Sequence, residues 1–492
     1  MKRILINALP KEVRIAILED DQLVEFYVER KGSRGIVGNI YKGKVLKIVP
    51  AIQAAFVDIG RFKNAFLYVK DAVSWEFEDD LFEEENRQEI ELPPIEEVLT
   101  QGQEVIVQVT KEALGTKGPR VTTNLTIPGH YLILLPTIRK VGISRRITDE
   151  AERERLRVIG EEICPEDYGI IIRTAAEGAT REDLEKDLQY LLKMWSSLEK
   201  KMEKRPPPAL IYQDLEIVPK ILRDVLSEDV DEVLIDSMPE YRRALNFARA
   251  FIPKLVNRIK LYDGNGPIFE VFKVEEAIEK ALSRKVYLPG GGYIVIDETE
   301  ALISIDVNSG KFKKSPNLEE TAFNVNCKAA KEIARQLRLR DVGGIIVIDF
   351  IDMKSEENKK KLIEILEQEF SKDRAKTKIV SMSDLGLVEM TRKRVKKSLG
   401  RSLTMTCPYC EGKGRVKSAD TVAFEVEREL LLVARENGKR KIKVYVHPLV
   451  AEKLSVDEKD IIDRIEVLFG KEIKIIPVND YHVERFTISK SD

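Results

Sequence analysis

The chain has 492 residues, of which 43% are hydrophobic and 34% are charged, and its formal net charge is -2. One hydrophobic core cannot serve this length, so roughly three to five compact units are expected. The balance of 82 basic and 84 acidic residues excludes a protein that coats nucleic acid over its whole surface, but it allows local basic tracks. No apolar run approaches the ~18 residues that span a bilayer. The N-terminus is too quickly charged for a signal peptide, so we expect a cytoplasmic protein.

The N-terminal half is rich in predicted strands. Residues 1–35 alternate apolar and polar side chains as half-buried strands do, and from Gly38 onward short strands are separated by glycines. Short, even strands with glycine turns are typical of a small barrel. Farther along, Thr180 and Asp183 form a capping-box pattern that predicts the start of a helix, which Pro206 ends.

The strongest strand signals lie in residues 284–400. Residues 292–310 predict a hairpin, residues 343–353 predict a buried strand, and residues 320–341 between them predict a helix. Beyond residue 417 the pattern predicts a small α/β segment with one long helix.

Two aspartates sit at or near the ends of these strands. Asp306 ends one apolar run and Asp349 ends another. Mg²⁺ typically binds through one or two carboxylates together with waters and a substrate phosphate. Asn308 would point from the same face as Asp306 if the strand continues, whereas Asp352 would not share the face of Asp349. The alternative is that both aspartates are ordinary turn residues.

Histidine is scarce, with three residues in the whole chain. Metal-free ribonucleases commonly use imidazoles as acid and base, but His130, His447 and His482 are scattered singly through different segments. A metal-activated water needs no histidine, so the composition favours metal-dependent hydrolysis.

Cys407 and Cys410 form a C-x-x-C pair followed by Gly412 and Gly414. Such a pair is half of a tetrahedral thiolate site. A redox dithiol would need a thioredoxin-like setting that this glycine-rich loop lacks, and an incidental pair is a further alternative. We favour one Zn²⁺ shared between two chains, which predicts a dimer.

Aromatic and basic residues interleave in the predicted barrel around Phe56 and Phe66, as in single-strand-binding barrels, although either ring alone could equally belong to the core. Arg173 and Thr174 close a later strand, and a guanidinium beside a hydroxyl can bind a phosphate.

These segments together resemble the ribonuclease E/G family over essentially the whole chain. The most specific stretches are IDVNSG (305–310), residues 320–353 and CPYCEGKGRV (407–416), with further matches at 39–45, 53–60, 143–147 and 173–178. The resemblance is to the ribonuclease G-like branch, or to a short form of the ribonuclease E branch, without the long disordered scaffold tail that the latter usually adds.

The resemblance implies a multidomain α/β architecture. Its expected parts are an RNase H-like subdomain (1–35 and 219–283), an inserted S1-like RNA-binding barrel (36–118), a 5′-sensor region (119–218), a DNase I-like catalytic subdomain (284–402), a zinc link (403–416) and a small dimerisation domain (417–492).

It also implies roles for individual residues. Asp306 and Asp349 would bind Mg²⁺ with help from Asn308, and Cys407 and Cys410 would bind the shared Zn²⁺. The remaining expected contacts are Phe56, Phe66, Lys111 and Lys117 with RNA, and Arg173, Thr174, the backbone from Gly129 to Ile133, and Lys376 with a 5′-monophosphate. Lys376 stands where the family often has arginine, so it keeps the charge but loses the bidentate fork.

The expected activity is hydrolytic cleavage of single-stranded, A/U-rich RNA to 5′-phosphate and 3′-hydroxyl ends, with a preference for 5′-monophosphorylated substrates. It would serve rRNA maturation, mRNA decay or both, in a homodimer that pairs into a homotetramer. The alternative is a non-catalytic RNA-binding or ribosome-assembly factor, and a DNA nuclease fits less well because a barrel for unpaired bases suits RNA.

Overall fold

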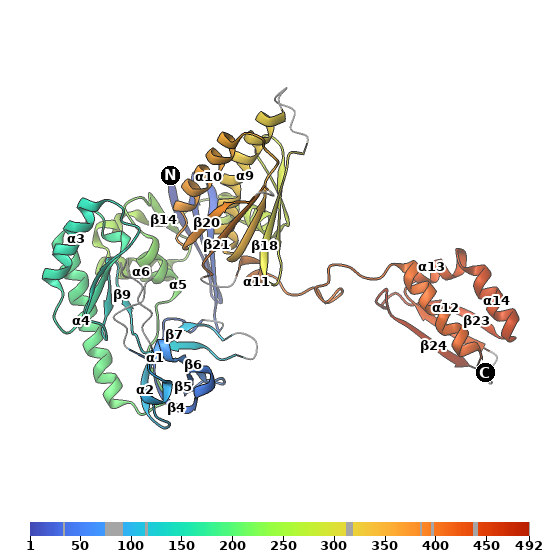
Figure 1. The fold of residues 1–492 in the computed structure, drawn as a ribbon, viewed down its shortest axis with the longest axis horizontal. Helices are drawn as coiled ribbons and strands as arrows, with labels where there is room; N and C mark the ends of the chain where they lie inside the picture. The colour runs from blue at the N-terminus through green and yellow to red at the C-terminus, as the bar shows by residue number, and fades with distance from the viewer. Residues whose placement is uncertain are drawn as a thin grey trace. The chain divides into compact units, whose positions relative to one another are not determined.

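The computed structural model describes residues 1–32, 35–73, 92–113, 117–310, 318–383, 386–394, 398–435 and 441–491 (Figure 1). The chain divides into two compact units, unit 1 (Met1–Leu399) and unit 2 (Gly400–Asp492). Four of the sheets lie within unit 1, each with its own hydrophobic core. The architecture is mixed α/β, as the sequence predicts.

The first sheet of unit 1 combines strands from residues 2–30 with strands from residues 232–261. Its strand order is β15-β14-β1-β2-β3, with bounds β1 (Lys2–Leu9), β2 (Glu12–Glu19), β3 (Gln22–Arg30), β14 (Glu232–Ile235) and β15 (Ile259–Leu261). Helices α5 (Ile217–Val225) and α6 (Met238–Phe251) bury their apolar faces against it. The helices α7 (Ile268–Val271) and α8 (Val274–Leu282) follow.

The second sheet closes into a five-stranded barrel, which confirms the small barrel predicted from the glycine-spaced strands. The ring runs β4-β5-β6-β8-β7 and is closed by pairing of β4 with β7; its bounds are β4 (Ile40–Val49), β5 (Ala54–Asp58), β6 (Ala65–Tyr68), β7 (Glu104–Lys111) and β8 (Arg120–Thr122). Gly43 lies where β4 crosses β5, and a Cβ there would meet the Asp58 carbonyl oxygen at 2.8 Å. Only glycine allows this close crossing of the two strands.

A third, smaller sheet carries the region after the barrel. Its order is β11-β12-β10-β9, with bounds β9 (Ile127–Pro128), β10 (Leu132–Leu135), β11 (Val141–Ile143) and β12 (Gly169–Ile172). Helices α3 (Glu150–Ile163) and α4 (Arg181–Lys204) pack on it. The capping box of Thr180 and Asp183 at the start of α4 is confirmed.

The fourth sheet, here called the aspartate sheet, has the order β16-β17-β18-β19-β21-β20. Its bounds are β16 (Lys285–Tyr287), β17 (Tyr293–Glu298), β18 (Leu302–Asn308), β19 (Gly344–Asp349), β20 (Thr377–Met382) and β21 (Leu387–Arg392). Helices α9 (Leu318–Arg340) and α10 (Glu356–Ser371) cover one face (Figure 1). The predicted hairpin is confirmed as the antiparallel pair β17–β18.

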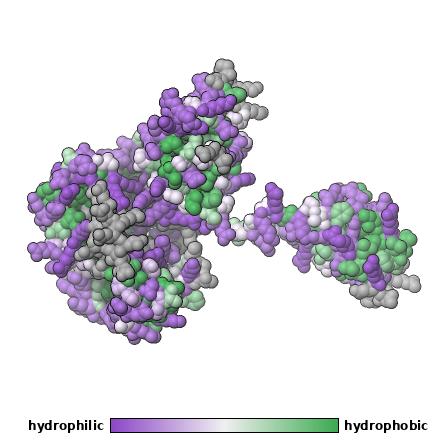
Figure 2. Space-filling model, viewed as in Figure 1, coloured by the Kyte–Doolittle hydropathy of each residue, from purple (hydrophilic) through white to green (hydrophobic). Residues whose placement is uncertain are grey.

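Unit 2 holds a three-stranded sheet with the order β23-β22-β24. Its elements after residue 417 are α12 (Ala419–Arg435), β22 (Lys441–Val446), α13 (Pro448–Val456), α14 (Lys459–Phe469), β23 (Glu472–Pro477) and β24 (Phe486–Ser491). The long helix predicted here is α12. Hydrophobic side chains lie on the surface of unit 2 around α14, where Val467 and Leu468 are exposed (Figure 2).

Candidate functional site

The two predicted metal-binding aspartates lie side by side on the aspartate sheet. The parallel pairing of β18 with β19 sets Asp306 directly opposite Asp349. Along β18 the side chains of Ile303, Ile305 and Val307 enter the core under α9 and α10, so the alternating Asp306 is exposed on the opposite face. Asp349 is exposed on that same face, here called the open face.

Asn308 belongs to this pair. Strand β18 runs through Asn308, so its side chain emerges on the same face as Asp306. Its amide nitrogen donates a hydrogen bond of 2.7 Å to the Asp306 carboxylate. Asp352 lies three residues beyond the end of β19 and is exposed, so it does not share a strand with Asp349.

The donor set at this position fits Mg²⁺. Among the described residues, no group of three or more His, Cys, Asp or Glu side chains is arranged to hold a metal ion. Mg²⁺ does not require such a cage, because it retains several waters and is held by one or two carboxylates plus substrate phosphate. Two exposed carboxylates in register on adjacent strands meet that requirement.

The barrel presents its two aromatic candidates on its outer surface. Phe56 and Phe66 are directly opposite each other on β5 and β6, and their ring centroids are 5.9 Å apart in an edge-to-face arrangement. Both rings are half-buried, whereas the alternating Ala55, Val57, Ala65 and Leu67 fill the barrel core. Neither phenylalanine is therefore a core residue, and both expose surface for contact.

Basic side chains extend the row of the two rings across the barrel. Phe66 pairs with Arg120 on β8, Arg120 pairs with Lys111 at the end of β7, and Phe56 pairs with Lys47 on β4. Lys47 and Lys111 are exposed. Lys117 is also exposed but lies in the segment that leads into β8, outside this row. The row places two adjacent stacking surfaces between basic side chains, a combination that barrels use to bind unpaired strands.

Arg173 is held firmly at the end of β12. Its guanidinium donates to the Gly129 carbonyl, to the His130 carbonyl at 3.3 Å and to the Asp224 carboxylate of α5 at 2.8 Å. Thr174 follows, and its hydroxyl lies 3.2 Å from the Ser144 hydroxyl. The predicted phosphate-binding pair thus gains a second hydroxyl.

The backbone beside Arg173 is fixed by a buried carboxylate. Asp187 accepts hydrogen bonds from the backbone amides of His130, Tyr131 and Leu132, and burial raises its pKa. Ile133 follows on β10, the strand paired with both β9 and β12. This anchoring explains how the turn from Gly129 onward keeps its carbonyls aimed at Arg173.

The histidines play structural roles. The ring of His130 is buried, bonds the Arg223 carbonyl through Nδ1 at 3.0 Å, and has a pKa lowered by burial. His447 caps α13 by accepting from the Leu449 amide. The Nε2 atom of His482 contacts the backbone carbonyl of Tyr409 within unit 2.

The segment around Lys376 reaches residues 119–218 through a neighbour of Lys376. The Asp373 carbonyl accepts a hydrogen bond of 2.9 Å from Arg146. Burial lowers the pKa of Arg146, and the positive charge of Arg374 lowers it further. Lys376 itself is exposed and lines a cavity of about 420 Å³ with Lys378 and Lys393. Asp373 thus contacts this region directly, and Arg374 lies close enough to affect the pKa of Arg146.

The cysteine pair forms a tight turn whose amides face sulfur. The backbone amides of Cys410 and Tyr409 hydrogen-bond the Cys407 sulfur and lower its pKa, and the Gly414 amide lies 3.4 Å from the Cys410 sulfur. The lowered pKa favours the Cys407 thiolate, the form that binds metal. Tyr409 packs on His482 with ring centroids 4.2 Å apart, which ties the turn to the segment before β24.

Comparison with known proteins assigns the chain to a family. The model of the "Ribonuclease E/G family" matches residues 126–395, and that of the "RNase E/G, Thioredoxin-like domain" matches residues 406–491. The chain belongs to the ribonuclease E/G family. It is 43% identical to "Ribonuclease G" of Salmonella typhimurium and 42% identical to "Ribonuclease G" of Escherichia coli K12, over 99% of each chain. It is 38% identical to "Ribonuclease E" of Haemophilus influenzae, covering 52% of that longer relative.

Family membership confirms the resemblance and the enzyme class, an endoribonuclease, that the motifs predict. The thioredoxin-like description applies to a stretch that includes the cysteines, yet Cys407 and Cys410 precede the first strand of unit 2 instead of following one. No helix in the described part of the chain is long and apolar enough to cross a membrane.

Sequence reasoning missed several residues that the structure adds to these surfaces. Lys47 and Arg120 join the barrel row only through strand pairing, and Ser144 and Asp224 reach Arg173 and Thr174 from distant segments. The family match at residues 143–147 contains Ser144, but nothing in that segment indicates that the Ser144 hydroxyl meets Thr174.

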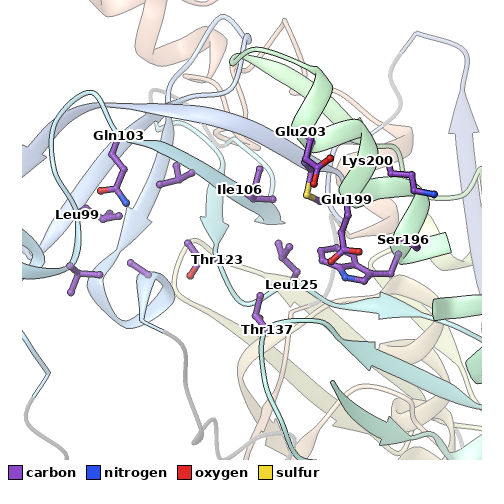
Figure 3. Close-up of a pocket in the computed structure, with 15 residues that line it drawn as sticks. Leu99, Gln103, Ile106, Thr123, Leu125, Thr137, Ser196, Glu199, Lys200 and Glu203 are labelled. Carbon is purple, nitrogen blue, oxygen red and sulfur yellow. The ribbon is translucent and has the colours of Figure 1, made fainter. Parts of the chain in front are cut away.

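A cavity of about 860 Å³ lies between the barrel strands and α4 (Figure 3). Ile106 and Leu125 line one side, and Ser196, Glu199 and Glu203 of α4 line the other. None of the residues predicted to bind metal, RNA or phosphate lines it.

Proposed function

We propose that this chain is a Mg²⁺-dependent endoribonuclease that cleaves within single-stranded, A/U-rich RNA and leaves 5′-phosphate and 3′-hydroxyl ends. The supporting observation is the register that sets Asp306 beside Asp349 on the open face. When bound, Mg²⁺ supplies positive charge at the scissile phosphate and acidity for the attacking water. The cofactor requirement is thus assigned to two exposed carboxylates in register on adjacent strands.

The chain's own residues then divide the work. Asp306 and Asp349 hold the ion, and the Asn308 amide restrains the Asp306 carboxylate through their hydrogen bond. Phe56 and Phe66 stack on bases while Lys111 and Lys117 contact the RNA backbone. Because the aspartates are carried on paired strands, their separation is fixed before substrate arrives.

The test replaces one oxygen ligand at a time. Asp306→Asn and Asp349→Asn should each abolish Mg²⁺-dependent cleavage of a 5′-monophosphorylated oligonucleotide while leaving RNA binding intact. Asp352→Asn, which removes an equally exposed carboxylate just beyond β19, is the matched control and should cleave normally. Full activity in either of the first two variants would overturn the assignment.

The preference for a 5′-monophosphate is assigned to Arg173, Thr174, the backbone at Ile133 and Lys376. A guanidinium held by two carbonyls and one carboxylate is pre-organised and loses little freedom when it binds phosphate. Arg173→Ala should lower cleavage of 5′-monophosphorylated RNA and leave cleavage of the 5′-hydroxyl form unchanged. Equal losses on both substrates would contradict this role.

Cys407 and Cys410 are assigned to a Zn²⁺ shared between two chains, which makes the enzyme a homodimer that pairs again into a homotetramer. Their turn supports the proposal because backbone amides face both sulfurs. Replacing both cysteines with serine should release ~0.5 zinc per chain, because each chain gives two of four ligands. Unchanged metal content and mass in the double variant would rule this out.

The cellular role we propose is rRNA maturation, mRNA decay or both. The supporting observation is near-full-length similarity to proteins named ribonuclease G. Sequencing the RNA ends that accumulate when the protein is depleted tests it, since an RNA-end profile unchanged by depletion would contradict both roles.

A further inference from the structure

The open face of the aspartate sheet continues past Asp306 toward its β16 edge. The strand register places Lys285 opposite Val295, which is itself opposite Asp306. In the neighbouring row Tyr287 is opposite Tyr293, which is opposite Asn308. Val286, Ile294 and Ile296 point into the core, so Lys285, Tyr287 and Tyr293 share the open face with the aspartates.

These three side chains form a compact group. The Lys285 ammonium lies 3.5 Å from the ring centroid of Tyr293 and 5.1 Å from that of Tyr287. The two rings meet edge to face with centroids 6.2 Å apart. Tyr287 is nevertheless 72% exposed. The contacts restrain the lysine but leave most of the Tyr287 ring uncovered.

The arrangement has the composition of a nucleotide-binding subsite. An exposed ring stacks on a base of any identity, and a cation beside it contacts the phosphodiester. Neither the Lys285 charge nor the Tyr287 ring is needed by the core, which is filled from the other face of the sheet. At the usual spacing of paired strands, Lys285 is about 10 Å from Asp306, a few nucleotides along an RNA strand.

We infer that Lys285, Tyr287 and Tyr293 bind single-stranded RNA beside the scissile phosphate. Tyr287 stacks on a base, Lys285 contacts the adjoining backbone phosphate, and Tyr293 positions the Lys285 ammonium. The inference rests on the proposed endoribonuclease function and adds a second RNA contact, separate from the barrel row of Phe56 and Phe66.

The stacking role is tested with abasic oligonucleotides. A 5′-monophosphorylated single strand of known cleavage position is made with one abasic nucleotide at each of the three positions on either side of that bond. Affinity is measured by fluorescence anisotropy in buffer without Mg²⁺, so that cleavage does not interfere. One abasic position should weaken binding to the intact protein by roughly five- to 150-fold, the range for one stacked base.

The variants locate that effect. In Tyr287→Ala the same abasic position should no longer weaken binding, whereas Tyr287→Phe keeps the ring and should behave as the intact protein. Because Tyr287 is mostly exposed, neither change should alter folding. An abasic penalty in Tyr287→Ala equal to that in the intact protein would overturn the inference.

The charge is tested through salt dependence. Lys285→Ala should reduce the slope of log affinity against log salt by about 0.7, as expected for one lost contact to single-stranded phosphate. Lys280→Ala on α8, which removes the same charge from a lysine paired with Glu276, is the matched control and should leave the slope unchanged. Equal slopes for Lys285→Ala and the intact protein would contradict the phosphate contact.

Failure here and failure of the proposed function give different results. If the intact protein neither binds nor cleaves the oligonucleotide, both fall together. If it cleaves in an Asp306-dependent manner while the Tyr287 and Lys285 variants match it in every binding measurement, the subsite alone is wrong.

Discussion

The buried ion pair between Asp373 and Arg392 offers the sharpest test of how the segment after α10 is held to the aspartate sheet. Their side chains are 3% and 4% exposed. Arg392 donates to Asp373 at 2.7 and 3.2 Å, to Asp341 at 3.1 Å and to the Val342 carbonyl at 2.8 Å. It therefore clamps the segment after α10 onto the start of β19, the strand that carries Asp349 at its other end.

Asp373→Asn leaves the guanidinium buried beside a neutral amide that presents a donor where an acceptor stood. Breaking a buried pair on one side costs about 3–5 kcal/mol, because the remaining charge is uncompensated. We expect the lower end, about 3 kcal/mol, since Asp341 still faces Arg392. Unfolding in urea, followed by tryptophan fluorescence and circular dichroism, should show a clear shift of the midpoint to lower urea.

The matched control is Asp297→Asn. Asp297 also forms a two-bond pair with an arginine, Arg284, but their side chains are 36% and 72% exposed. Solvent and salt screen such a pair, so this variant should unfold with a midpoint close to that of the intact protein. Equal shifts for the two variants would refute the claim that burial, and not the pair itself, sets the cost.

Further predictions concern the same surfaces. Asp224→Asn removes the carboxylate that supports Arg173, so the preference for 5′-monophosphorylated over 5′-hydroxyl RNA should fall in paired cleavage assays; an unchanged ratio would contradict this. Lys47→Ala removes an exposed cation from the barrel row and should reduce the salt slope of RNA affinity by about 0.7; an undiminished slope would exclude a phosphate contact. The hydrogen bond from Arg155 lowers the pKa of Glu152 from 4.5 to about 2. Its stabilisation is therefore complete above about pH 4.5 and is lost as the pH falls toward 2. Thermal melting should show Glu152→Gln less stable than the intact protein at neutral pH. The difference in melting temperature should narrow below about pH 4.5, and a constant difference would exclude this linkage.

The sequence by itself determined the elements that local patterns encode. Alternating apolar residues specify the strands that carry Asp306 and Asp349, because a period of two buries one face and exposes the other. The capping box at Thr180 is likewise a local signal that the structure confirms. Family motifs then supplied the enzyme class, which the comparisons confirm.

The tertiary structure decided which distant residues meet. Asp306 and Asp349 become a pair only because β18 and β19 are parallel and in register. The residues of the two strands do not by themselves specify this register. Strand pairing also decided that Phe56 and Phe66 lie outside the barrel core, and it placed Arg120 beside them. The fold also brings Arg146 to the carbonyl of Asp373, three residues before Lys376 and far from Arg146 in the sequence. The hydrophobic period is encoded within one segment, whereas strand register and contacts between distant residues depend on the packing of all segments together.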